Sequence, residues 1–207
     1  MSTVHLLDHV AGNVRSLVNA IEKVGYTVEW IQSPGDVAEA EVIHTFQQHP
    51  DPKIESTLKL ILQVIASAGY IEPIKQHIEA GKPFMGICVG LQALFEGSEE
   101  NPAVSGLGLL SGRLERFKDE DKSVPHIGWN SANTSNGGDE QSTQESLYGL
   151  RPDSKYYYVH SYAVPYQEGV LEKDGWAVAT ARYGNEKFIG AIAKDNVLAT
   201  QFHPEKS

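Results

Sequence analysis

The sequence predicts an α/β fold built on a parallel sheet, and three observations lead to this fold class. The first 30 residues give a strand, a helix and a second strand, the usual opening of a parallel α/β sheet. Another strand-to-helix passage follows at residues 83–95. Runs of β-branched and aromatic residues then recur through the C-terminal half, and such runs are typical of strands.

The N-terminal elements follow from their apolar patterns. The run at 4–7 predicts a strand, which ends at Asp8. A helix follows from Asn13, because apolar residues recur there at helical spacing until Gly25 ends it. Residues 26–30 predict the second strand. The apolar helix positions are Val14, Leu17, Val18, Ile21 and Val24.

The middle of the chain is harder to assign. Residues 33–36 predict a turn, and the range 42–59, with prolines on both sides of Asp51, predicts an exposed loop or atypical insertion. After it, residues 59–68 fit a helix, and residues 60–62 fit a strand equally well.

Regular elements return at Ile71. We expect a helix over 71–81, a strand over 83–87 and a helix over 91–97. The polar range 133–145 predicts a surface loop. Further strands are expected at residues 113–117, 155–160, 176–182, 188–193 and 197–202.

Composition narrows the function classes. A chain of 207 residues suits a single domain, here taken as residues 1–207, and a net charge of -10 argues against nucleic acid or an anionic membrane as partner. The single cysteine, Cys88, excludes an internal disulfide and a multi-cysteine metal cluster, so we expect no metal and no cofactor. Without a long apolar run or a targeting pattern, we expect a cytoplasmic protein with a reduced thiol.

Cys88 lies in the pattern Gly-x-Cys-x-Gly, between an expected strand and an expected helix. This is the cysteine counterpart of a nucleophile elbow, in which glycines permit a sharp, strained turn. The helix N-terminus favours a thiolate, and the amide of Val89 can face a developing oxyanion. A lone cysteine is more often structural, but the flanking glycines favour a nucleophile.

The last expected strand leads into His203, and Glu205 lies two positions further on. Residues i and i+2 of an extended chain point to the same side, so Glu205 can accept a hydrogen bond from His203. The second imidazole nitrogen would then face a thiol, as a Cys-His-Glu triad requires.

The segments 86–92 (GICVGLQ) and 201–205 (QFHPE) resemble the class I, or triad, glutamine amidotransferases. Segments 8–17, 124–130 and 156–162 further resemble the glutaminase subunits or domains of imidazole glycerol phosphate synthases. The resemblance covers about residues 1–40 and 68–207. It implies an open, mostly parallel twisted sheet of flavodoxin-like type, flanked by helices and extended by antiparallel strands.

The resemblance also implies a reaction. Cys88 would attack the side-chain amide of glutamine, releasing ammonia and leaving a glutamyl thioester that water hydrolyses to glutamate. His203 would act as general base and acid, Glu205 would orient it, and the Val89 amide would stabilise the oxyanion. The positions that hold the substrate in the family correspond to Gly86, Gln92, His160, Ser161 and Tyr162.

In the resembled family the ammonia passes to a (β/α)8 cyclase barrel. The products there are imidazole glycerol phosphate and aminoimidazole carboxamide ribotide, in histidine biosynthesis. No barrel is contained in these residues, so the resemblance implies a separate subunit or a fused domain. The implied interface residues are Pro125, Ile127, Gly128, Trp129 and Asn130, with Ile127 and Trp129 as apolar anchors.

Two departures from the family predict impaired activity. The family carries a Pro-Gly-x-Gly oxyanion loop after its third strand, but this chain has no glycine between Gly35 and Gly69. If residues 60–62 form that strand, the loop is missing, and removing one oxyanion donor costs about 10²–10³ in rate. The sequence also stops two residues after Glu205, so we expect this carboxylate to be poorly held.

Three alternatives remain open. One is the glutaminase of another synthase, such as that of anthranilate synthesis, although residues 124–130 argue against it. Another is a non-catalytic scaffold that only binds a partner, which the missing glycines favour. The third is a cysteine hydrolase of a different elbow-bearing family, whose catalytic partners lie elsewhere in the chain.

Overall fold

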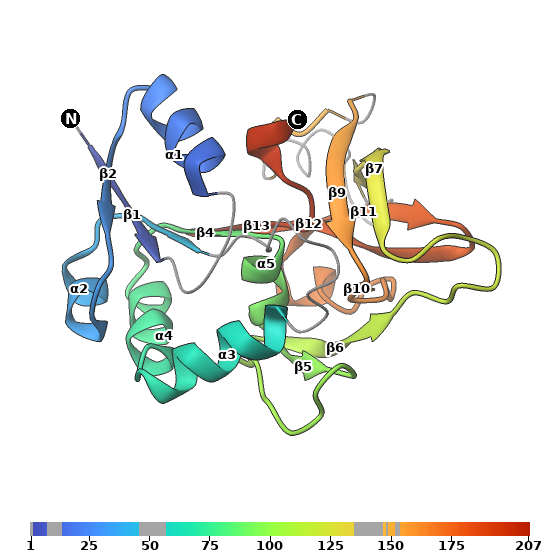
Figure 1. Ribbon diagram of the computed structural model, residues 1–207, viewed down its shortest axis with the longest axis horizontal. Helices are drawn as coiled ribbons and strands as arrows, with labels where there is room; N and C mark the ends of the chain where they lie inside the picture. The colour runs from blue at the N-terminus through green and yellow to red at the C-terminus, as the bar shows by residue number, and fades with distance from the viewer. Residues whose placement is uncertain (1, 8–13, 46–56, 135–146, 148, 152–153) are drawn as a thin grey trace.

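The computed structural model describes residues 2–7, 14–45, 57–134, 147, 149–151 and 154–207. Within them the chain forms a mixed eight-stranded sheet with helices on both faces (Figure 1). Helix α1 lies on one face of the sheet, and α3 and α4 lie on the other. An α/β fold with a parallel sheet was therefore predicted correctly.

The strand order of the large sheet is β2-β1-β3-β4-β13-β12-β11-β8. The first five strands in this order are parallel, and the remaining three continue the sheet in antiparallel pairs. The parallel strands are β1 (Thr3–Leu7), β2 (Thr27–Trp30), β3 (Ile43–Thr45), β4 (Phe84–Ile87) and β13 (Val197–Thr200). The antiparallel strands are β12 (Glu186–Lys194), β11 (Ala177–Tyr183) and β8 (Asn133–Thr134).

Two smaller sheets complete the described strands. A three-stranded sheet has the order β10-β6-β5, and β7 pairs with β9 in an antiparallel ribbon. These strands are β5 (Phe95–Ser98), β6 (Leu110–Arg116), β7 (His126–Asn130), β9 (Tyr156–His160) and β10 (Tyr162–Ala163).

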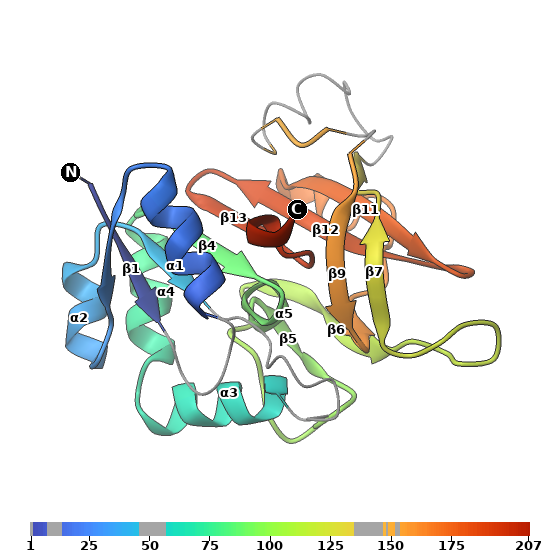
Figure 2. The ribbon, with the colours of Figure 1, turned by 45° about the horizontal axis from the view of Figure 1, so that its top comes forward.

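The helices cover the parallel half of the sheet with apolar faces. In α1, the buried residues Leu17 and Ile21 are four positions apart, as an amphipathic helix requires. Figures 1 and 2 both place the C-terminal turn η2 between α1 and the β7–β9 ribbon. The helices are α1 (Val14–Lys23), α2 (Pro34–Glu39), α3 (Thr57–Ser67), α4 (Ile71–Glu79) and α5 (Val89–Ala93), with the short 3₁₀ turns η1 (Glu172–Asp174) and η2 (Pro204–Lys206).

Two buried clusters form the core. The larger lies between the parallel strands and their helices, and the smaller lies among the C-terminal strands. Aromatic rings dominate the smaller cluster, where Tyr158, Phe188 and Phe202 are each at most 2% exposed. This aromatic layer connects the β7–β9 ribbon to the antiparallel half of the large sheet.

The third strand was not expected where it lies. It is β3 at residues 43–45, which pairs with β1 and β4. Residues 60–62, for which a helix and a strand fitted equally well, belong to helix α3. The expected insertion at 42–59 therefore includes a central strand and the start of a helix, and its residues 46–56 lie outside the described part. The error arose because β3 is only three residues long, too short to show an apolar alternation.

Three smaller expectations also need correction. The expected turn at 33–36 instead opens a helix, α2, where the Asp36 carboxylate accepts hydrogen bonds from two backbone amides. The helix after Cys88 ends at residue 93, and residues 95–98 form strand β5 instead. The polar range 133–145 begins with strand β8, and the rest of it, from 135, lies outside the described residues.

Candidate active site

The nucleophile candidate lies at the carboxyl end of two neighbouring parallel strands. Thr200 of β13 is the register partner of Ile87 in β4, and the Cys88 amide donates to the Thr200 carbonyl over 2.7 Å. Cys88 has φ 52 and ψ -98, and among the described non-glycine residues only Asp195 shares a positive φ. Such strain persists where the surroundings enforce it, commonly at functional sites. The sharp turn expected from the sequence is therefore present.

Gly86 permits the close approach of α5 to β4. A Cβ atom at this position would lie 2.7 Å from the Gly90 carbonyl carbon and 2.8 Å from its oxygen. Both distances are shorter than real Cβ contacts, so only glycine fits without a shift of the backbone. The residue assigned from the sequence to substrate binding thus has a clear packing role, and a contact with substrate stays a prediction.

His203 and Glu205 form a buried pair just after β13, the strand that lies beside Cys88. The distance between His203 Nδ1 and Glu205 Oε1 is 3.0 Å, and the two side chains are 2% and 1% exposed. Burial acts to raise the pKa of Glu205, but the hydrogen bond and charge of His203 outweigh it and hold this pKa below its ordinary value. The carboxylate is well held, so the expectation of a poorly held Glu205 was wrong.

The end of the described chain explains why Glu205 is held. The His203 amide donates to the Tyr157 carbonyl over 2.8 Å, which fixes this segment to β9. The Ser207 hydroxyl donates to the His203 carbonyl over 2.7 Å and accepts from the Tyr157 amide over 3.0 Å. A short turn, η2, therefore presents the carboxylate to the imidazole.

The thiol of Cys88 is fully buried. Burial first, and then the negative charge of Glu205, raise its pKa to about 12. The Val89 amide and the Gln201 side chain act in the opposite direction, because both donate toward sulfur. A base is therefore needed to take the proton, and the Nε2 atom of His203 is buried without a hydrogen-bond partner among the described residues.

Gln92 is buried and belongs to a series of hydrogen-bonded polar groups beside Cys88. Its amide donates to the Cys88 carbonyl over 3.1 Å, which places it one helical turn after the cysteine, as expected. Its Nε2 atom donates to the Tyr162 carbonyl over 3.0 Å and to Gln201 Oε1 over 3.1 Å. The His160 Nδ1 atom lies 2.9 Å from the same Tyr162 carbonyl.

His160 is neutral at ordinary pH. Burial first, and then the nearby His126, lower its pKa to about 3, although the bond to Tyr162 opposes the shift. A carbonyl accepts but cannot donate, so the proton of His160 lies on Nδ1. Ser161 is half-buried, and its carbonyl accepts from the Phe117 amide over 3.0 Å. The structure thus brings His160 and Tyr162 into the site and gives Ser161 a backbone role nearby.

The expected partner residues lie on β7 and just before it. Ile127 and Trp129 are 52% and 58% exposed, and the Trp129 ring contacts Tyr157 of β9 edge-on at 5.8 Å. Pro125 and Gly128 are half-buried. Asn130 is tied to β11, because its Nδ2 atom donates to the Arg182 carbonyl over 2.8 Å. The exposed apolar side chains therefore lie one strand away from the backbone that holds His203.

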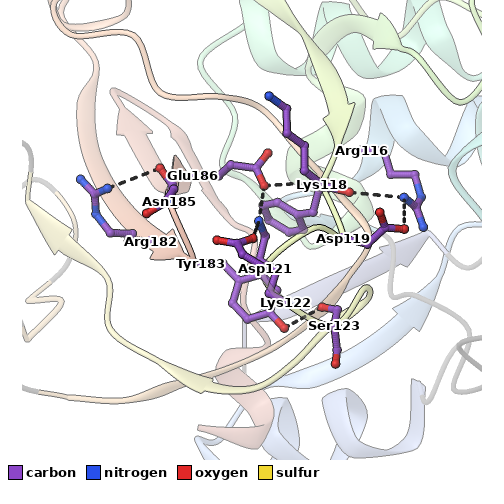
Figure 3. Close-up of polar contacts among 11 residues, drawn as sticks. Arg116, Lys118, Asp119, Asp121, Lys122, Ser123, Arg182, Tyr183, Asn185 and Glu186 are labelled. Carbon is purple, nitrogen blue, oxygen red and sulfur yellow. Dashed lines mark hydrogen bonds and ion pairs between the residues drawn. The ribbon is translucent and has the colours of Figure 1, made fainter.

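A charged cluster fixes the loop that leads into β7 (Figure 3). Lys122 lies between the carboxylates of Asp121 and Glu186, and the Tyr183 hydroxyl donates to the Ser123 carbonyl over 2.7 Å. Hydrogen bonds to the two carboxylates raise the pKa of Lys122, with Glu186 as the larger cause. Because Tyr183 also stacks on His126 at 4.0 Å, the loop and the first residue of β7 are anchored together.

Sequence reasoning missed two kinds of residue. Gln201 belongs to the quoted QFHPE segment but received no role, although it contacts the sulfur. Tyr157, His126 and Lys122 also received none, because their roles depend on strand pairing. The only signal in the sequence for Gln201 was its position two residues before His203.

Within the described residues, no group of three or more His, Cys, Asp or Glu side chains is arranged to hold a metal ion. No helix in the described ranges has the length and apolar character needed to cross a membrane.

The parallel sheet thus carries a strained cysteine elbow and, just past the neighbouring strand, a buried His203–Glu205 pair. The family model for class-I glutamine amidotransferases matches residues 5–207, and the chain belongs to this family. The chain is 60% identical over 211 aligned residues to imidazole glycerol phosphate synthase hisHF of Emericella nidulans, covering 100% of this chain and 36% of that protein. It is 38% identical to the subunit HisH of Syntrophotalea carbinolica, covering 98% of this chain and 92% of that protein.

The chain therefore spans about a third of the length of the fungal relatives, 36% in Emericella nidulans and 35% in Schizosaccharomyces pombe. Among solved structures, a glutamine amidotransferase superposes with a TM-score of 0.67 at 18% identity, covering 99% of this chain and 91% of that one. At this identity the likeness concerns the fold alone, and the fold agrees with the one expected from the resemblance.

Proposed function

We propose that this chain hydrolyses L-glutamine to glutamate and ammonia, as the glutaminase part of an imidazole glycerol phosphate synthase. The observation that carries the proposal is the placement of Cys88 at a strained elbow, beside the strand β13 that leads into the buried His203–Glu205 pair. The relatives that cover the whole chain carry this enzyme's name, and the family model is that of glutamine amidotransferases.

The contacts assign a role to each group of the triad. A carboxylate only accepts, so the bond to Glu205 places the proton of neutral His203 on Nδ1 and leaves a lone pair on Nε2. Nε2 takes the thiol proton while the sulfur of Cys88 attacks the amide carbon of glutamine. The resulting oxyanion faces the Val89 amide, which already interacts with the sulfur.

Collapse of the intermediate completes the first half of the reaction. His203 returns its proton to the amide nitrogen, the C–N bond breaks, and ammonia leaves a glutamyl thioester on Cys88. Water then attacks the thioester and His203 accepts the water proton. The C–S bond breaks, glutamate is released, and His203 returns the proton to the sulfur of Cys88. The protonated imidazole formed at each step is stabilised by the ionised Glu205, whose pKa is lowered.

We further propose that the ammonia passes to a cyclase barrel that docks on the exposed side of β7. Ile127 and Trp129 are two of the few large apolar residues that are exposed within the described ranges, and aromatic residues are enriched in interfaces. The names of the relatives include both the separate subunit HisH and the fused hisHF, which agrees with a cyclase as partner.

A coupled assay tests both parts of the proposal. The full-length protein, or this chain mixed with a cyclase subunit, is supplied with glutamine, and glutamate release is followed. We expect Cys88→Ser to abolish release and Trp129→Ala to weaken cyclase binding by about 30-fold or more, as loss of a central aromatic anchor does.

Trp30→Ala is the matched control, because Trp30 is also an exposed tryptophan, 44% accessible, on the far edge strand β2. Equal loss of binding in both variants would contradict the assigned interface. Binding of the cyclase without any Cys88-dependent glutamate release would favour the scaffold alternative instead.

A further inference from the structure

Gln201 is fully buried beside the nucleophile. It follows the last residue of β13, is 0% exposed, and its Nε2 atom lies 3.5 Å from the sulfur of Cys88. Its Oε1 atom accepts from Gln92 Nε2 over 3.1 Å. Both ends of this amide therefore have partners, one of which is the reacting atom.

The neighbouring contacts fix which end of the amide faces sulfur. The Tyr162 carbonyl accepts from Gln92, so the atom of Gln92 at this junction is its nitrogen, which also reaches Gln201. A nitrogen donor requires an acceptor, and that acceptor is Gln201 Oε1. If the Gln201 amide were rotated by half a turn, its NH₂ group would face the NH₂ group of Gln92, and neither could accept a hydrogen bond. Its nitrogen must consequently point at the sulfur.

The chain of contacts is anchored at its far end by His160. The neutral imidazole donates from Nδ1 to the same Tyr162 carbonyl, and His160 is only 1% exposed. The side chains of Gln201, Gln92 and His160 are buried and the Tyr162 carbonyl between them accepts from two of them, so the orientation of Gln201 is set by the packed interior and not by solvent.

We propose that Gln201 is a positioning residue, whose N–H group holds the sulfur of Cys88 and stabilises it as a thiolate during attack. This inference rests on the proposed glutaminase function for its relevance to catalysis. Hydrogen bonds to a charged acceptor are stronger than those to a neutral one, so the contact gains strength as the thiol loses its proton. The donor matters because burial otherwise disfavours the charged sulfur.

The test measures the thiol directly and needs no glutamine. Iodoacetamide alkylation of the native chain is followed between pH 6 and 10 by the mass of the peptide that contains Cys88, the one cysteine in the sequence, so that adducts on other side chains are not counted. The variant Gln201→Met keeps the length and removes the donor. We expect its alkylation rate to fall about tenfold, the loss of one hydrogen bond to a charged group.

Two further variants separate donation from packing. Gln201→Glu keeps an acceptor for Gln92 but sets a carboxylate against the sulfur, and we expect it to alkylate more slowly than Gln201→Met. Gln201→Asn retains the amide on a shorter side chain, and we expect a rate near that of Gln201→Met. Gln76→Met is the matched control, because Gln76 is exposed on α4 and its side chain bonds only Glu72 among the described residues.

Near-ultraviolet circular dichroism identifies the variants that remain folded. Alkylation of folded Gln201→Met or Gln201→Asn at the wild-type rate would overturn the proposal, as would a Gln201→Glu variant that reacts faster than wild type. If the rates behave as expected while the wild type releases no glutamate with a cyclase, the proposed function fails and the role of Gln201 stands. Normal turnover with unchanged alkylation across the series would overturn the role of Gln201 and leave the glutaminase function intact.

Discussion

The substitution Gly86→Ala tests how tightly α5 is packed on β4. The added Cβ would meet the Gly90 carbonyl carbon at 2.7 Å and the Leu91 amide nitrogen at 3.0 Å, and all of these groups are backbone. Ordinary contact begins near 3.4 Å, so α5 has to move by several tenths of an ångström away from the strand. Overpacking of this kind costs about 1–3 kcal/mol.

The same shift displaces Cys88 and the Val89 amide, which lie between β4 and α5. We therefore expect Gly86→Ala to lower Tm by roughly 3–10 °C and to lower kcat for glutamine hydrolysis by about 10²-fold, because small misplacements of reacting groups are costly. Thermal unfolding and glutamate release measure the two effects.

Gly35→Ala is the matched control, because Gly35 is exposed in α2 and the nearest atom to its added Cβ is Ser33 Oγ at 3.6 Å. Alanine is the better helix former, so this variant gains about 0.5–1 kcal/mol. If the two variants unfold alike and Gly86→Ala keeps full activity, the close packing at the elbow is refuted.

Four further predictions concern the site and its pH dependence. Glu205→Gln lowers kcat by about 10²–10⁴-fold with little change in KM, as measured by glutamate release, because the imidazole loses its charged partner. Burial lowers the pKa of His126 from 6.5 to about 4. Between these pH values the unfolded chain binds a proton at His126 that the folded chain does not bind, so the free energy of unfolding falls as the pH drops from 6.5 to about 4. Urea midpoints of His126→Phe should fall less steeply there. The raised pKa of Cys88 affects stability at alkaline pH. The unfolded thiol ionises with a pKa of 9.0, whereas the folded one stays protonated to about 12, so the wild type loses stability as the pH rises through this interval. The urea midpoint of Cys88→Ala should therefore decline less than that of the wild type between these pH values. The absence of glycine between Gly35 and Gly69 still predicts slow turnover, about 10²–10³ below ordinary glutaminase rates with a cyclase present, and turnover at ordinary rates would show that these glycines are dispensable.

Local patterns in the sequence were sufficient for several elements. Helix α1 was predictable because its apolar residues recur with a clear helical period. The pair His203–Glu205 was also predicted, but the reason given was wrong: a 3₁₀ turn, η2, brings Glu205 to the imidazole, and the chain there is not extended. The elbow was predictable because glycines flank Cys88 in a strand-to-helix passage.

Long-range pairing was not predictable. Strand β3 has three residues and lies between β1 and β4 only because the sheet places it there. Gln201 faces Cys88 because of the register between β13 and β4, across more than a hundred residues of chain. Propensity and spacing describe neighbours along the chain and contain little about such contacts.

We infer that Cys88 becomes a nucleophile through His203 at this elbow, and labelling of the thiol tests this inference most directly. The measurement is intact mass of the folded chain after exposure to a glutamine-analogue diazoketone, for wild type, Cys88→Ala and His203→Gln. We predict a single adduct on the wild type, none on Cys88→Ala and much slower labelling of His203→Gln. A folded wild-type chain that stays unlabelled, or a His203→Gln variant that labels at the wild-type rate, would contradict this role for the pair.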